Sequence, residues 1–302
     1  MPEIWFPHLG IEIDHLSRVA FSLFGMDVYW YGLIIGVAIL LAVALVMHEA
    51  KRTGQDPDEY MDFGLVAIIL SVIGARVYYV IFSWEMYRDN PLEILNFRHG
   101  GLGIYGAVLV GIGYGLFYAI RKKKNFFLMA DTVLPSLLLG QLCGRWGNFF
   151  NREAFGGYTD SLFAMRYLKE QVASSNLTQD ILAHTITVNG AEYIQVHPTF
   201  LYESLWNLCL FALLLYLRKR HKAFDGQIGA LYCIGYGMGR FWIEGLRTDQ
   251  LLLWHTNIAV SQVVSLGMVA AGLGIYLYLW KKKKIEKVEK KCWLLSKTVY
   301  NN

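Results

Sequence analysis

Four charged side chains interrupt long apolar stretches of this 302-residue sequence. They are Arg76, Arg145, Arg240 and Glu244. A charge inside an apolar segment long enough to cross a membrane is costly, and by default it marks a functional site. Arg240, Glu244 and Arg247 are spaced so that a helix places them on one face. Two interpretations are open: a structural ion pair, or an anion site in which Glu244 orients a guanidinium toward a phosphate. We favour the anion site, because arginines outnumber acidic residues among these charges. Phospholipid phosphate is the obvious anion for a site within a membrane.

The segment GRWGNFFNREAFGG, residues 144–157, adds amides to this chemistry. Arg145, Asn148 and Asn151 recur every three residues and would lie on roughly one face of a helix. Asparagine amides both donate and accept hydrogen bonds, so they suit glycerol hydroxyls, ester carbonyls or phosphate oxygens. The alternative is a polar helix end that enters a loop, with its glycines used for packing.

Further polar residues stand at the ends of apolar segments and are candidates for the same cavity. Tyr31 begins the first segment, and HPTFLYE places His197, Tyr202 and Glu203 at the start of the fifth. Tyrosines at such ends are commonly membrane-interface residues, so both tyrosines fit an aromatic belt equally well. His99, in front of a glycine run, would serve as a proton carrier or simply be interfacial.

Long apolar runs must position these side chains. The sequence is 55 % hydrophobic and 17 % charged, whereas soluble domains carry about 25 % charged residues. Spanning helices need roughly 17–25 apolar residues. We therefore predict an all-α integral membrane protein with seven transmembrane helices. The predicted spans are Val28–Met47, Met61–Phe82, Gly103–Ile120, Phe126–Phe150, Thr199–Leu217, Gln227–Leu246 and Asn257–Trp280.

Basic residues predict the orientation of these spans. They gather after spans one, three, five and seven, most densely at Arg121–Lys124 and Lys281–Lys284. Because short cytoplasmic loops are rich in Lys and Arg, the N-terminus is predicted outside and the C-terminus in the cytoplasm. Spans two, four and six then run outward, which places Arg76, Arg145 and Arg240 in the outer half of the membrane at one depth.

The remaining segments complete a single membrane domain over residues 1–302. Residues 1–27 are predicted to be an amphipathic interfacial arm, and residues 281–302 a basic cytoplasmic tail. Residues 151–196 are predicted to form a small external α/β cap, in which the Asn-Gly pair of ITVNGAEYIQV indicates a hairpin. The four cysteines have no CxxC spacing and no His/Cys cluster accompanies them, so no metal site is expected.

The segment GRWGNFFNREAFG resembles the signature of the bacterial prolipoprotein diacylglyceryl transferase family, G-R-x-G-N-F-x-N-x-E-x-x-G. The signature positions are Gly144, Arg145, Gly147, Asn148, Phe149, Asn151, Glu153 and Gly156. The resemblance covers nearly the whole chain, because further family blocks occur along it. These are WYG at Trp30–Gly32, GAR at Gly74–Arg76, the block Gly100–Gly106, HPT…LYE from His197, and GRFWIEGLRTDQ from Gly239.

The resemblance implies an enzyme of the bacterial cytoplasmic (inner) membrane. Such an enzyme transfers the sn-1,2-diacylglyceryl group from phosphatidylglycerol to the lipobox cysteine thiol of a prolipoprotein. A thioether forms and glycerol 1-phosphate leaves. The implied partners are phosphatidylglycerol, the prolipoprotein signal peptide and the lipid bilayer. The resemblance implies no metal, no soluble cofactor and no nucleic acid.

The residue patterns above and the resemblance together give the candidate site residues. The candidate catalytic residues are Arg145, Arg240, Glu244, Tyr105 and Tyr31. The candidate substrate-binding residues are Arg145, Asn148, Asn151, Glu153, Gly156, Arg76, His197, Tyr202 and Arg247. The two arginines of the catalytic set are expected to stabilise the charge that builds on the leaving phosphate. Tyr105 stands where some family members have a histidine that is a suggested base, so it is the candidate for proton handling.

Two other classes of protein compete with an enzyme. A transporter or lipid channel would show internal repeats and a polar site near the membrane midplane. Here no repeat is evident, and the predicted polar cluster is displaced outward. An assembly factor that binds lipid without chemistry is the other alternative.

Overall fold

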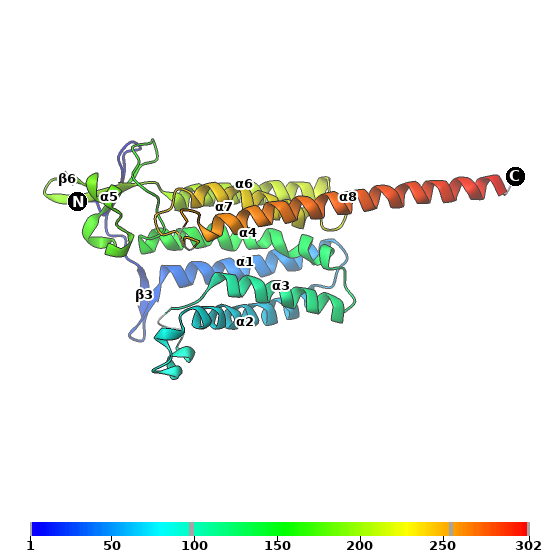
Figure 1. Ribbon diagram of the computed structural model, residues 1–302, viewed down its shortest axis with the longest axis horizontal. Helices are drawn as coiled ribbons and strands as arrows, with labels where there is room; N and C mark the ends of the chain where they lie inside the picture. Colours follow the sequence, from blue (N-terminus) through cyan, green and yellow to red (C-terminus); the bar gives the residue numbers. More distant parts are fainter. Residues whose placement is uncertain (1, 97–99, 254–255, 301–302) are drawn as a thin grey trace. The chain divides into compact units, whose positions relative to one another are not determined.

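The computed structural model describes residues 2–96, 100–253 and 256–300 (Figure 1). Two compact units make up the chain: residues 1–42 together with residues 134–302, and residues 43–133. The larger unit contains most of the sequence motifs, and the smaller one contains Arg76 and Tyr105.

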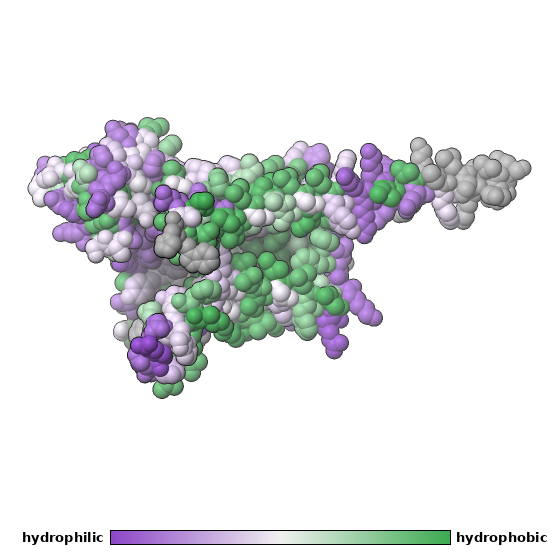
Figure 2. All heavy atoms as spheres, in the orientation of Figure 1, coloured by the Kyte–Doolittle hydropathy of each residue, from purple (hydrophilic) through white to green (hydrophobic). Residues whose placement is uncertain are grey.

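Six helices among the described residues are long and apolar enough to cross a membrane. They are α1 (Trp30–Arg52), α2 (Pro57–Phe82), α3 (Ile104–Arg121), α4 (Phe126–Asn151), α6 (Thr199–Arg220) and α8 (Val260–Tyr300). Their surfaces expose large apolar side chains such as Leu40 and Ile120, and Figure 2 shows hydrophobic residues gathered over the helices. A soluble protein rarely exposes apolar surface on this scale, so the chain is a multi-pass membrane protein.

The sixth predicted span forms a helix that differs from the others. This helix, α7 (Gln227–Glu244), is not among the six, because it is rich in glycine and carries Arg240 and Glu244. It packs against α6 and α8. A Cβ atom on Gly237 would lie 2.8 Å from the Ser265 carbonyl oxygen of α8, so the two helix backbones approach closely. Arg240 and Glu244 find partners within the protein. The count of seven spans remains a prediction.

A small five-stranded sheet lies outside the helices, with the strand order β2-β1-β5-β7-β6 and antiparallel pairing throughout. Its strands are β1 (Ile4–Phe6), β2 (Ile11–Ile13), β5 (Met165–Leu168), β6 (Ile186–Val188) and β7 (Ala191–Val196). The β6–β7 hairpin is confirmed. Its turn residues, Asn189 and Gly190, both have positive φ, at 51° and 84°, as the tight hairpin turns require.

Shorter elements complete the larger unit. They are the hairpin β3 (Val19–Leu23)–β4 (Met26–Tyr29), helix α5 (Gln179–Ala183), and the 3-10 turns Lys169–Gln171 and Ser174–Asn176. The predicted arm thus supplies β1 and β2 to a sheet whose other strands come from residues 151–196. A core that includes Ile4, Phe149, Tyr167 and Ile194 joins the two segments. Sequence patterns did not reveal this pairing, because β1 and β2 have three residues each and their partner strand is distant in sequence.

The smaller unit is built on a close contact between α2 and α3. A Cβ atom on Gly74 of α2 would lie 2.9 Å from the Gly106 carbonyl oxygen of α3, so neither position has room for a side chain. The segment between the two helices contains the 3-10 turns Trp84–Met86 and Pro91–Leu95. At the other end of the unit, a core around Tyr60, Ala119 and Met129 holds the helices together.

Candidate active site

Three helices bring two arginines onto one buried carboxylate. Arg145 comes from the last two turns of α4, Glu203 from the second turn of α6 and Arg240 from the next-to-last turn of α7. Nη2 of Arg145 lies 2.8 Å from Oε1 of Glu203, and Nη1 of Arg240 lies 3.1 Å from Oε2. The Glu203 side chain is 3 % exposed, whereas the two arginines are 19 % and 17 % exposed. The two arginines are therefore more accessible than the carboxylate that they share.

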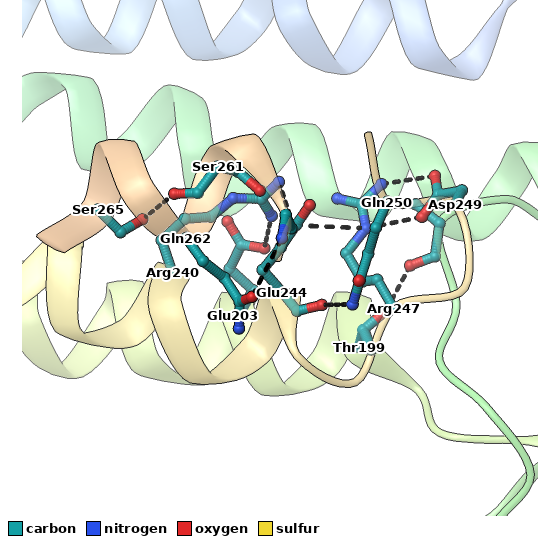
Figure 3. Close-up of polar contacts among 12 residues, drawn as sticks. Thr199, Glu203, Arg240, Glu244, Arg247, Asp249, Gln250, Ser261, Gln262 and Ser265 are labelled. Atoms are coloured by element: carbon teal, nitrogen blue, oxygen red, sulfur yellow. Dashed lines mark hydrogen bonds and ion pairs between the residues drawn. The ribbon is translucent and has the colours of Figure 1, made fainter. Parts of the chain in front are cut away.

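The spacing of residues on α7 adds a second carboxylate. Glu244 is one helical turn after Arg240, and its Oε2 lies 2.6 Å from Nη2 of Arg240 (Figure 3). The same oxygen is 3.9 Å from Nε of Arg247. Gln250 returns from the following loop and donates a hydrogen bond to the Glu244 carbonyl oxygen. Glu244 thus holds Nη2 of Arg240, while Glu203 holds Nη1.

Arg247 has a carboxylate partner of its own. Its Nε and Nη2 donate to the two oxygens of Asp249 at 2.9 Å and 2.7 Å. Burial by itself would raise the pKa of Asp249. The hydrogen bond and positive charge of Arg247 outweigh that effect, so this pKa lies below its ordinary value. Asp249 is therefore ionised at neutral pH and neutralises Arg247.

The charge of the cluster differs from the one that we expected. Arg145, Arg240 and Arg247 face three carboxylates, because Glu203 and Asp249 join Glu244. The expected surplus of positive charge is wrong for these six residues. The spacing of residues on α7 did not reveal this balance of charge, since Glu203 lies on another helix and Asp249 follows the last helical turn.

The asparagines of the signature share a further acid, and one of them contacts Arg145 directly. Nη1 of Arg145 is 3.4 Å from Oδ1 of Asn148, a long hydrogen bond. The side-chain amides of Asn148 and Asn151 both donate to Oε1 of Glu153, at 3.0 Å and 3.1 Å. Glu153 thereby sets which way the two amide groups point. The Arg145, Asn148 and Asn151 side chains form one continuous polar surface at the end of α4.

An unusual backbone holds Glu153. Its neighbours Arg152 and Ala154 have φ values of 54° and 58°, in the left-handed region that non-glycine residues seldom adopt. An ion pair of 2.6 Å between Arg152 and Glu3 anchors one side, and the Thr199 hydroxyl donates to the Ala154 carbonyl on the other. Such strain persists only where the surroundings enforce it, and it clusters at functional sites.

Gly156 connects three loops at a point that has no room for a side chain. Its N–H donates to the His197 carbonyl oxygen at 3.0 Å, and its backbone pairs with that of Arg247. A Cβ atom there would lie 2.7 Å from Cβ of His197 and 2.8 Å from the Leu246 carbonyl oxygen. The loop after α4 therefore stays in register with the loop after α7 only if residue 156 is glycine.

Tyr31, His197 and Tyr202 also belong to the larger unit. The Tyr31 ring packs directly on Gly147, where a Cβ atom would overlap it. Nδ1 of His197 lies 3.3 Å from the Tyr202 hydroxyl, and burial lowers the pKa of the His197 imidazole. These contacts place Tyr31 beside the end of α4 and pair His197 with Tyr202 at the start of α6.

Arg76, in the smaller unit, is bound in a different way. Its guanidinium donates five hydrogen bonds of 2.7–3.0 Å to backbone carbonyls, those of Glu93, Ile94, Asn96, Gly100 and Gly101. Its side chain is buried, and the Tyr87 ring lies 5.2 Å from its Cζ. These contacts favour a structural role, the fastening of the loop between α2 and α3. Tyr105 lies near Tyr78, with ring centroids 6.2 Å apart, and His99 falls outside the described residues.

Two groups that complete the cluster were not assigned a role from the sequence. Glu203 was a candidate for the cavity without a function, and Asp249 was part of the block from Gly239 without being singled out. A carboxylate in an apolar helix is as costly as an arginine, and that signal pointed to Glu203. Among the described residues, no group of three or more His, Cys, Asp or Glu side chains could hold a metal ion.

Comparisons with known proteins identify the family of this chain. The family model described as prolipoprotein diacylglyceryl transferase matches residues 18–278. The chain is 42 % identical over 269 residues to the phosphatidylglycerol–prolipoprotein diacylglyceryl transferase of Clostridioides difficile (strain 630), covering 89 % of this chain and 98 % of that relative. The protein of the same name from Bacillus cereus (strain Q1) is 39 % identical over 280 residues, which are 93 % of this chain and 97 % of the relative. The chain therefore belongs to the prolipoprotein diacylglyceryl transferase family.

Proposed function

We propose that this protein transfers the sn-1,2-diacylglyceryl group of phosphatidylglycerol to the lipobox cysteine of prolipoproteins and releases glycerol 1-phosphate. Family membership and the names of relatives that match over most of the chain support this activity. The single observation that carries it is the pair Arg145 and Arg240. Both are held in place by Glu203, and both are open to an incoming anion.

The reaction moves negative charge from sulfur to phosphate. The cysteine thiolate is the nucleophile, and it attacks the glyceryl carbon that carries the phosphate ester. The carbon–sulfur bond forms as the carbon–oxygen bond breaks, and the electron pair of the broken bond stays on the phosphate oxygen. The thiol proton leaves to solvent or to the phosphate. Preorganised positive charge at the leaving phosphate lowers this barrier, and Arg145 and Arg240 supply it.

The carboxylates of the cluster position the arginines rather than use up their hydrogen-bonding capacity. Nη2 of Arg145 and Nη2 of Arg240 lie within ion-pair distance of Glu203 and Glu244. Each guanidinium carries five N–H donors, more than these contacts use. N–H groups of both guanidiniums thus remain for phosphate oxygens. A phosphodiester brings one negative charge to a balanced cluster, and the leaving monoester brings more, so binding strengthens as the reaction proceeds.

The remaining residues orient the lipid and complete the pocket. Asn148 and Asn151, aligned by Glu153, bind the glycerol head group, and Tyr31 lies beside them at the end of α4. Arg247 lies in the loop after α7, and the pair of His197 and Tyr202 lies at the start of α6. Gly156 keeps those loops together.

We also infer that the protein lies in the bacterial cytoplasmic membrane with seven spans and an outside N-terminus. Arg145 and Arg240 lie near the C-terminal ends of α4 and α7, and Glu203 near the N-terminal end of α6. The opposite end of α6 carries Arg218, Lys219 and Arg220 in its last turn. Because basic ends face the cytoplasm, the cluster belongs to the outer side, where prolipoproteins emerge.

A reconstituted assay tests the activity. Purified protein in liposomes that contain phosphatidylglycerol is mixed with a lipobox peptide, and mass spectrometry follows the peptide cysteine. We expect the cysteine to gain one diacylglyceryl group and an equal amount of glycerol phosphate to appear. Liposomes of phosphatidylethanolamine alone and a peptide with cysteine replaced by serine are the controls. A protein that binds the lipid but never modifies the peptide would overturn the proposal in favour of a lipid-binding assembly factor.

A further inference from the structure

The turn of the β3–β4 hairpin contains a residue that its backbone conformation does not favour. Phe24 and Gly25 have φ values of 50° and 75°, close to the 51° and 84° of Asn189 and Gly190 in the β6–β7 turn. Turns of this kind prefer Asn or Asp before the glycine, and a bulky side chain at positive φ is an outlier. The β6–β7 hairpin follows the preference, whereas the β3–β4 hairpin does not. Phe24 therefore needs an explanation that the turn itself does not supply.

Packing within the protein does not supply that explanation either. Phe24 is 92 % exposed, and among the described helices and strands β3 and β4 make their main contacts with each other. The five-stranded sheet of the same unit instead buries Ile4, Tyr167 and Ile194 in a protein core. A two-stranded hairpin on its own is at best marginally stable in water. The β3–β4 hairpin is therefore expected to have a partner outside the described chain.

The pairing of the two strands gives this hairpin one apolar face. Alternate residues of a strand point to the same side, and the strand register places two cross-strand pairs there. The resulting apolar hairpin face consists of Phe21, Leu23, Met26 and Val28. All but Val28 are exposed. The opposite face carries Ser22 and Asp27, whose hydroxyl and carboxylate form a hydrogen bond of 2.5 Å. The hairpin is thus amphipathic, as a structure that lies between lipid and water should be.

Chain connectivity identifies lipid as the partner. Strand β4 ends at Tyr29 and helix α1 begins at Trp30, with no residue between them. The Trp30 N–H donates to the Arg18 carbonyl oxygen at 3.0 Å, which ties the base of the hairpin to the start of the helix. Helix α1 is long and apolar enough to cross a membrane, and Trp and Tyr gather where such helices leave it. The hairpin therefore lies at the membrane surface, and Figure 1 shows it extending across the axis of α1 rather than along it.

The backbone of the hairpin limits how deeply it enters the membrane. Among the described strands, β3 and β4 pair only with each other, so each has an open edge. Open strand edges do not occur in the hydrocarbon region, where their N–H and C=O groups would lack partners. The strands must stay at the level of the lipid head groups, and only side chains reach further. Exposed apolar residues of the spanning helices face hydrocarbon directly, so the hairpin is a different kind of lipid contact.

We propose that the β3–β4 hairpin is a membrane-surface anchor. Its apolar hairpin face rests on the phospholipid leaflet at the N-terminal end of α1, and Phe24 inserts among the lipid chains. A second copy of this chain or an apolar peptide is the alternative partner, but neither is brought to the hairpin by its direct connection to a spanning helix. The interfacial arm expected over residues 1–27 is thereby narrowed to residues 19–29. The inference goes beyond the proposed function and does not depend on it.

Spin labels on two neighbouring residues test the apolar hairpin face. The four native cysteines are replaced by serine, and a nitroxide is attached through Met26→Cys on that face or Asp27→Cys on the opposite one. In phosphatidylglycerol liposomes, collisions with oxygen report contact with lipid, and collisions with a water-soluble nickel chelate report contact with water. We expect the oxygen-to-nickel ratio to be at least ~5-fold higher for Met26→Cys, because an amphipathic element turns its apolar face to lipid. Equal ratios would overturn the proposal. Low access of both reagents to the Met26→Cys label would overturn it in favour of a protein partner, such as a second copy.

A further substitution tests Phe24 itself. Phe24→Asn gives this turn the residue pair of the β6–β7 turn, so the hairpin should keep its shape. The oxygen-to-nickel ratio of the Met26→Cys label should nevertheless fall at least ~3-fold, because the apolar side chain at the tip is lost. Leu182→Asn, at an exposed leucine of α5, is the matched control and should leave the ratio unchanged. The same ratio with and without Phe24→Asn would show that Phe24 does not anchor the hairpin. Neither measurement uses transferase activity, so a failure of the proposed function would not affect this test.

Discussion

Arg76 and the pair Arg145 and Arg240 show two ways to place an arginine in an apolar helix. The sequence presents all three alike, as charges in predicted spans. In the structure, the Arg76 guanidinium donates five hydrogen bonds to backbone carbonyls of one loop. Arg145 and Arg240 instead share the carboxylate of Glu203. The partners differ, and so does the accessibility.

The difference distinguishes a structural arginine from arginines that can bind a ligand. The side chain of Arg76 is 4 % exposed, and its five hydrogen bonds to carbonyls hold backbone positions. Arg145 and Arg240 retain 19 % and 17 % exposure although carboxylates hold both of them. A buried charge is therefore functional only when its partners leave part of its hydrogen-bonding capacity unused. The following predictions test this comparison, in order of decreasing effect on activity.

Loss of either open arginine should have the largest effect. Arg145→Ala or Arg240→Ala should lower kcat/KM at least ~10²-fold, because each removes preorganised charge from the leaving phosphate. The reconstituted transferase assay measures the rate, and a thermal melt in detergent checks the fold. Arg240→Lys keeps the charge without the planar fork and should fall between the wild type and Arg240→Ala. Wild-type rates in either alanine variant would show that Arg145 and Arg240 contribute no more to catalysis than Arg76 is expected to.

The loop scaffold of the cluster should be the next most sensitive feature. Gly156→Ala introduces a Cβ atom 2.7 Å from Cβ of His197. The loop must then shift, and a displacement of about 1 Å at a reacting centre can cost ~10²-fold. We expect kcat to fall between ~10- and ~100-fold. Gly157→Ala is the matched control, since a Cβ atom there meets nothing within 4 Å. Similar losses in both variants would show that the close contact at Gly156 does not matter.

Glu203→Gln tests whether the shared carboxylate positions the arginines. The amide keeps the size of the side chain but removes one negative charge between Arg145 and Arg240. The cluster becomes net positive, so KM for phosphatidylglycerol should fall. The arginines also lose their anchor, so kcat should fall about tenfold, less than on loss of an arginine. Steady-state kinetics over a range of lipid fractions separates the two constants. An unchanged kcat would mean that Glu203 only neutralises charge.

Arg76→Met should reverse the pattern, with a small effect on activity and a large one on stability. Five carbonyls lose their donor, and each buried group left unpaired costs ~1–3 kcal/mol before the loop relaxes. We expect the melting temperature to fall by at least about 5 °C. The rate per folded molecule should change less than about threefold. A rate loss as large as that of Arg240→Ala, without a stability loss, would place Arg76 among the phosphate ligands.

The smallest effect concerns pH. Burial lowers the folded-state pKa of His197 below its ordinary value of 6.5. Below that value the unfolded chain binds a proton that the folded chain resists, so stability is lost as the pH falls through 6.5 toward the folded pKa. Between pH 7.5 and 5.5 the wild type should lose about 1–2 °C more in melting temperature than His197→Gln. Identical pH profiles would show that His197 is solvated in the fold.

Much of the architecture follows from local patterns in the sequence. Six of the predicted spans are long apolar helices because about twenty apolar residues in a row have few other stable arrangements. The four-residue spacing of Arg240 and Glu244 places them in contact on α7, since neighbours on a helix face depend only on helical geometry. The Asn-Gly pair predicts the β6–β7 turn for a similar reason. The signature from Gly144 to Gly156 identified the family.

The partners of the buried charges depend on the tertiary structure. Glu203 meets Arg145 and Arg240 because α4, α6 and α7 pack with these faces together, and no spacing within one helix encodes that rotation. Asp249 reaches Arg247, and β1 pairs with β5, through loops whose path the sequence does not display. Local spacing therefore determines which residues share a helix face, whereas the packing of helices decides whether a charge is balanced, enclosed or open to substrate.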